Sequence, residues 1–134
     1  MMKVVGLFRE LSRNANHSVA SIHSESGRLE VSLVNAVLTY LRSGIPVLDF
    51  MEATIDPLDS TRSIPGGPSL VSDGEWVWRH DLPYFVERYR VGLPDKFIEC
   101  VLYEKTVKAD RQTVIANWAQ ALDAYQRAEL GEHG

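Results

Sequence analysis

Residues 72–89 read SDGEWVWRHDLPYFVERY and predict a β-hairpin followed by a helix. The Asp-Gly pair at 73–74 lies between two apolar runs. This is a strong hairpin signal, because a type I′ turn needs positive φ at both central residues. We therefore expect a hairpin over residues 69–79. With a two-residue loop at 73–74, Val71 faces Trp76 across the hairpin.

The alternation of side chains along a strand places Trp76 and Trp78 on one face of this hairpin and Val77 on the other. Two tryptophans on one face are favoured as core anchors, since each buries a large apolar area. Tryptophan is also enriched among residues that dominate binding energy, so an interface role is the alternative.

The helix after the hairpin is expected to start at Asp81, a candidate N-cap, with Pro83 in the first turn, where its missing N–H is not needed. Its predicted buried stripe is Leu82, Phe85, Val86 and Tyr89, and it ends at residues 90–92. Further helices are expected to start near 94 and 110, the last running to about 130. Inward residues are expected to be Phe97, Ile98, Val101 and Leu102, then Val114, Ile115, Trp118, Leu122 and Tyr125.

The remaining segments complete an α+β expectation for one domain over residues 1–134. Residues 28–43 predict a helix with Gly44 as its left-handed C-cap. Residues 47–55 are expected to form a strand and residues 56–68 an ordered loop or lid. The N-terminal KVVGLFREL has helical spacing, but a strand is the alternative. We expect about four helices packed on a small antiparallel sheet of about three strands.

Charge is distributed unevenly along the chain. The net charge is −4, yet residues 46–87 contain eight acidic and two basic side chains, a balance of −6. This argues against nucleic acid as a direct ligand and favours a basic protein partner, although solvated loop and cap charges would give the same count. No apolar run is long enough for a membrane span, and a single cysteine, Cys100, fits a reducing cytoplasm.

Few residues suggest catalysis. His80 beside Asp81 resembles a base oriented by a carboxylate, but helix capping is the favoured role of Asp81. Asp56 and Asp59 could act as paired carboxylates, although turn capping is more common for such a stretch. We interpret Cys100 as a buried, inert thiol. No cofactor or metal is expected.

Six short motifs occur in order between residues 40 and 97: YLRSG, DPLD, GGPSL, SDGEWVW, DLPYFV and LPDKF. This order resembles a group of small bacterial proteins with the pattern (T/S)DGxWxW…DLxYYxxxY…LPxxF, which are similar to immunity proteins of polymorphic toxin systems. The resemblance covers about residues 40–100. It departs from the pattern at 83–85, Pro-Tyr-Phe, where paired tyrosines are usual.

The resemblance implies a non-catalytic protein that binds a toxin domain and blocks its active site. Combined with the acidic segment, it implies a cognate toxin with a basic cleft. The candidate partner-binding residues are Asp56, Asp59, Asp73, Glu75, Arg79, Asp81, Tyr84 and Glu87. The alternatives are a regulatory interaction domain, or a small-ligand binder or enzyme with a cleft between the 56–68 loop and the 69–79 hairpin.

Overall fold

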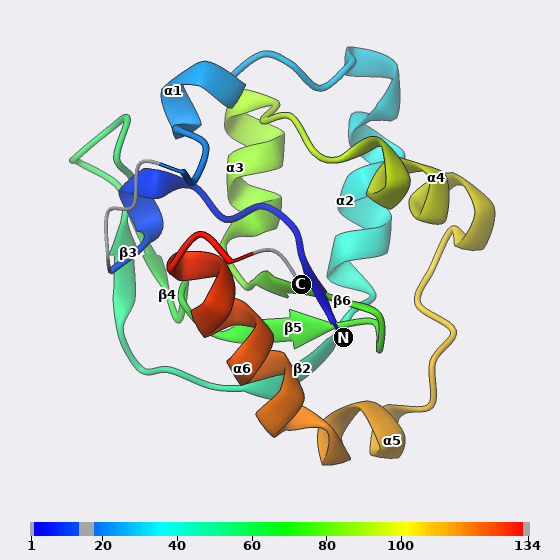
Figure 1. Cartoon of the computed structure of the whole chain (residues 1–134). Helices are drawn as coiled ribbons and strands as arrows, with labels where there is room; N and C mark the ends of the chain where they lie inside the picture. The colour runs from blue at the N-terminus through cyan, green and yellow to red at the C-terminus, as the bar shows by residue number, and fades with distance from the viewer. Residues whose placement is uncertain (1, 14–17, 133–134) are drawn as a thin grey trace.

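The computed structural model describes residues 2–13 and 18–132, and these form an α+β fold (Figure 1). Its strands are β1 Lys3–Val4, β2 Ile45–Leu48, β3 Ala53–Ile55, β4 Ser63–Pro65, β5 Leu70–Ser72 and β6 Trp76–Arg79. Its α-helices are α1 Ile22–Glu25, α2 Val34–Arg42, α3 Leu82–Tyr89, α4 Asp95–Glu104, α5 Arg111–Ala116 and α6 Trp118–Glu129. Two 3₁₀ helices span Arg9–Leu11 and Val31–Leu33. No described helix has the length and apolar character that crossing a membrane requires.

The main sheet has four strands in the order β1-β6-β5-β2, and β3 pairs with β4 in a separate two-stranded sheet. The α+β prediction is thus confirmed, with more strands and helices than expected. The main sheet is mixed rather than antiparallel, because β1 runs parallel to β6. The N-terminal segment is therefore a strand followed by a 3₁₀ turn.

The predicted hairpin is confirmed, but its turn lies one residue further along the chain, so each strand partner is shifted by two residues. Val71 pairs with Trp78, and the two-residue loop is Gly74-Glu75. The side chain of Asp73 causes the shift, because its Oδ1 accepts the backbone N–H groups of Glu75 at 2.8 Å and Trp76 at 2.6 Å. Of the two loop residues only Gly74 has positive φ, +96°, as a type II′ turn requires.

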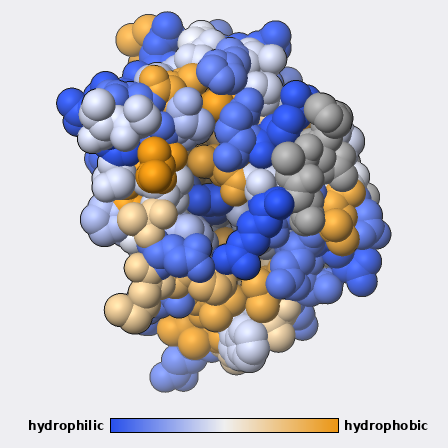
Figure 2. Space-filling model, turned by 90° about the vertical axis from the view of Figure 1, so that its left-hand side faces the viewer, coloured by the Kyte–Doolittle hydropathy of each residue, from blue (hydrophilic) through white to orange (hydrophobic). Residues whose placement is uncertain are grey.

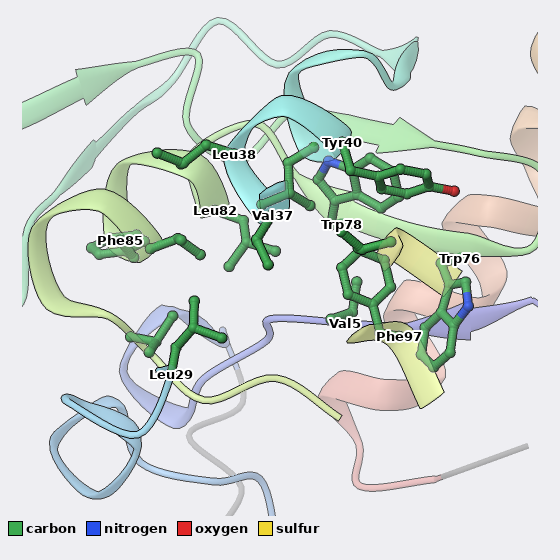
Figure 3. Close-up of a cluster of buried hydrophobic side chains, with 14 of the residues drawn as sticks. Val5, Leu29, Val37, Leu38, Tyr40, Trp76, Trp78, Leu82, Phe85 and Phe97 are labelled. Atoms are coloured by element: carbon green, nitrogen blue, oxygen red, sulfur yellow. The ribbon is translucent and has the colours of Figure 1, made fainter. Parts of the chain in front are cut away.

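The two faces of this hairpin enter different parts of the core, as predicted. Trp76 and Trp78 pack edge-on against Phe97 of α4, with ring centroids 5.3 and 5.8 Å apart (Figure 3). Val77 points to the opposite side of the sheet and packs with residues of α6. Figure 1 shows α6 on one side of the sheet and α2, α3 and α4 on the other.

The segment between α2 and β5 departs from prediction. The expected strand at 47–55 is two strands, β2 and β3, and the expected 56–68 loop contains β4, which folds back on β3. Gly44 does not have positive φ and is no left-handed cap. A Cβ there would lie 2.5 Å from both Trp78 and Val71, so this glycine is required for close packing.

The C-terminal helix prediction was wrong in one respect. The helix starts at Asp110, whose side chain accepts the N–H of Thr113, but it breaks at Asn117 into α5 and α6. The break turns Ile115 and Trp118 outward, and they are 39% and 47% exposed. Leu102, expected to face inward on α4, is also half exposed.

Candidate partner-binding site

Asp56 is buried in a cluster that ties the 56–59 turn to helix α3. Its carboxylate accepts hydrogen bonds from the hydroxyls of Tyr84 at 2.7 Å and Tyr89 at 2.5 Å, and from the N–H of Leu58 at 2.8 Å. Burial alone would raise the pKa of Asp56, but the hydrogen bonds from Tyr89 and Tyr84 outweigh burial and hold that pKa below its usual value. Burial, and next to it the hydrogen bond to Asp56, raises the pKa of Tyr84 to about 12.

Arg79 and Asp81 form a buried ion pair. The guanidinium donates to both carboxylate oxygens, at 2.8 and 3.1 Å, and the two residues are 4% and 1% exposed. Thr54 of β3 bridges the pair, donating to Asp81 at 2.8 Å and accepting from Arg79 at 3.0 Å. Arg79 also donates to the Tyr125 hydroxyl of α6. The pair therefore joins β6, β3 and α6.

This network contradicts two predictions. The Asp81 side chain makes no capping hydrogen bond to α3, because both its oxygens are engaged by Arg79 and Thr54. Both charges of the pair are also too deeply buried to contact a partner, as is Asp56. Position 67 must be glycine for this network to form, since a Cβ there would lie 2.8 Å from the Asp81 carboxylate.

The other predicted interface carboxylates have neighbours of their own. Asp73 accepts a 2.6 Å hydrogen bond from the hydroxyl of Tyr40. Each of the other three pairs with a base: Asp59 with Arg88 at 3.1 Å, Glu75 with Lys3 at 3.5 Å, and Glu87 with Arg42 at 3.0 Å. Of the eight predicted interface residues, only Glu75 and Glu87 are exposed. Residues 46–87 therefore do not present an unpaired acidic surface made of these side chains.

The side chains considered for catalysis are also engaged. Asp81 is held by Arg79 and Thr54, so its oxygens are not available to orient the exposed His80. Burial raises the pKa of the Cys100 thiol, which lies 3.4 Å from the Tyr40 hydroxyl, and a thiol with a raised pKa is a poor nucleophile. Among the described residues no group of three or more His, Cys, Asp and Glu is arranged to hold a metal ion.

The motifs that carry the family resemblance therefore act within the fold. They supply the Asp56–tyrosine cluster, the Arg79-bound Asp81, the tryptophan and Phe97 core, and two glycines in crowded positions. Of the motif residues, Trp76, Leu93 and Asp95 also line a hollow at the surface.

The structure has a hollow of about 900 Å³, partly open to solvent, which we call the β1 groove. It is lined by residues of the 2–8 segment that contains β1, of the 18–33 segment, of the 92–98 segment and of the 124–132 segment at the end of α6, together with Trp76 of β6. Its apolar residues include Val4, Leu7, Phe8, Leu29, Leu33, Trp76, Leu93 and Ile98. Its charged residues are Lys3, Glu25, Arg28, Glu30, Asp95, Arg127 and Glu132.

The β1 groove lies away from the cleft that was expected between the 56–68 loop and the hairpin, and sequence reasoning did not identify it. Residues from five separate parts of the chain line the groove, so no local motif marks it. The one sequence feature that could have pointed to the groove is that residues 1–39 and 101–134, which supply much of its lining, lie outside the resemblance.

A second apolar surface has no assignable occupant. Figure 2, which looks onto the left-hand side of Figure 1, shows apolar residues gathered over the lower part of that face. Met51 and Ile55, next to and within β3 on this side of the molecule, are exposed. Nothing in the described part of the chain indicates what would cover them.

No protein-family model, curated protein or solved structure matches this chain.

Proposed function

We propose that this chain is a non-catalytic immunity-type protein that acts in the cytoplasm by binding a bacterial toxin domain and blocking it. The observation that carries the proposal is the difference between the groups considered for catalysis, which are engaged by other residues, and the accessible β1 groove. Of the groups considered for catalysis, Asp56, Asp81 and Cys100 are hydrogen-bonded within the fold and Asp59 is paired with Arg88, whereas the β1 groove is partly open to solvent, apolar at its floor and charged at its rim. That composition is typical of protein interfaces.

The resemblance over residues 40–100 supports the same proposal, because it is to proteins that are similar to immunity proteins. The acidic segment 46–87 is replaced as the proposed contact surface, since the carboxylates predicted to form the interface are hydrogen-bonded, paired or buried. The β1 groove takes its place, built largely from the parts of the chain outside the resemblance.

Small-ligand binding is the second candidate. A hollow of about 900 Å³ is within the size range of small-molecule sites, and its lining includes many apolar side chains.

Co-expression with the product of the neighbouring gene tests the proposal. That product is expected to stop growth when expressed alone, to be tolerated in the presence of this protein, and to co-purify with it in a stoichiometric complex. A neighbour that is harmless, or that kills cells equally with and without this protein, would overturn the proposal. The control is the same chain with Trp78→Ala, which is expected to be destabilised by about 3–5 kcal/mol and therefore to protect less than the parent protein.

A further inference from the structure

The β1 groove joins an apolar floor to a charged rim. Leu33, Leu93 and Ile98 are partly buried on the edge of the main core, and they come from the 18–33 and 92–98 segments. Trp76 adds its ring to the same hollow. An apolar surface of this kind with polar groups at its border marks an interaction site more than an ordinary exposed surface does.

The charges on the rim do not cancel. Each basic side chain already has an acidic neighbour: Lys3 with Glu75 at 3.5 Å, Arg28 with Glu25 at 3.9 Å, and Arg127 with Asp123 at 2.9 Å and Glu132 at 3.7 Å. In contrast, Glu30 and Asp95 form no ion pair with any described residue. The groove therefore offers unpaired negative charge from two separate segments.

We infer that the β1 groove is the docking site for a basic amphipathic polypeptide segment, with apolar side chains on the floor and Lys or Arg side chains next to Glu30 and Asp95. This inference rests on the proposed function, in which the segment belongs to the toxin domain. A polypeptide is favoured over a small molecule because the hollow is only partly enclosed, whereas small-molecule sites enclose most of their ligand. The mode is that of an amphipathic helix in a groove.

The test uses untagged protein and three fluorescein-labelled synthetic peptides, each about 14 residues long. The first has leucines on one helical face and lysines on the other. The second has glutamates in place of the lysines, and the third is the first peptide with its residues scrambled. Fluorescence anisotropy is expected to show saturable binding of the first peptide only, weakening as salt is raised.

The matched variants each remove two negative charges. Glu30→Gln with Asp95→Asn alters the groove, and Glu52→Gln with Asp49→Asn alters exposed sites elsewhere. The groove variant is expected to bind the lysine peptide roughly threefold to tenfold more weakly, and the control variant as the parent does. Thermal unfolding of both variants shows whether the fold is intact.

The same variants enter the growth assay with the toxin. Less protection by the groove variant than by the control supports the inference. Three results overturn the inference: equal protection by both variants, equal binding of the lysine and glutamate peptides, and binding of neither peptide. If the parent protein still protects cells in these cases, the proposed function stands. If the lysine peptide binds in a charge-dependent way but the product of the neighbouring gene is harmless, the proposed function is overturned. The inference that the groove binds a basic amphipathic segment then still holds.

Discussion

Replacement of Asp81 by alanine tests whether the buried ion pair holds the sheet to its neighbours. Asp81 is 1% exposed and accepts hydrogen bonds from Arg79 and Thr54, and it makes no capping bond that the change would also remove. The variant leaves the Arg79 guanidinium buried without its counter-charge. Breaking a buried pair from one side costs about 3–5 kcal/mol, which is a large part of the roughly 5–15 kcal/mol that stabilises a domain.

Asp123→Ala is the matched control, because Asp123 accepts a 2.9 Å hydrogen bond from Arg127 in an ion pair on the exposed surface of α6. Its removal is expected to change the free energy of unfolding by no more than about 0.5 kcal/mol. Urea denaturation measures both values. In thermal unfolding, Asp81→Ala is expected to lower Tm by roughly 10–20 °C.

A double variant, Arg79→Met with Asp81→Ala, separates the pair from its parts. Since the double variant leaves no unpaired charge, its cost is expected to be smaller than the sum of the single variants by about 1–3 kcal/mol. If Asp81→Ala costs no more than Asp123→Ala, or if the single costs simply add, the ion pair does not hold these elements together.

Three further predictions concern stability. Trp76→Ala and Trp78→Ala are each expected to cost about 3–5 kcal/mol, measured by urea denaturation; retention of full stability by both variants would contradict the core role. Gly44→Ala is expected to cost about 1–3 kcal/mol in the same assay, because the added methyl group overlaps two packed side chains; an unchanged midpoint would show that this contact relaxes freely. Asp56 has a lowered pKa in the folded chain, so its stabilising contribution is present above its unfolded pKa of about 3.9 and is lost as pH falls through the folded value. Asp56→Asn should therefore flatten the loss of stability below about pH 4, and an unchanged acid profile would contradict this assignment.

Local patterns were sufficient to predict the central hairpin and the helices after it. The alternation of Trp76, Val77 and Trp78 fixes which face each enters, and the structure confirms it. The register was missed because the Asp73 side chain bonds to the backbone and moves the turn by one residue, which the dipeptide rule does not include. The break at Asn117 has no proline or glycine to announce it.

The site was predicted less well, because counting charges along the sequence treats every carboxylate as exposed. The tyrosines that bind Asp56 lie far away in the chain, at Tyr84 and Tyr89. Thr54, which binds Asp81, is on a strand that was expected to be part of a longer one. Spatial pairing of this kind depends on tertiary structure. The β1 groove was missed for the same reason.

Both ends of the described chain reach the same place. Met2 and Glu132 each line the β1 groove, so anything joined there, an affinity tag or further polypeptide, begins at its border. A fused segment would be held at a high local concentration next to the groove and could occupy it in preference to a separate molecule. A label inserted at the exposed residues 60–62, between β3 and β4, would avoid this competition.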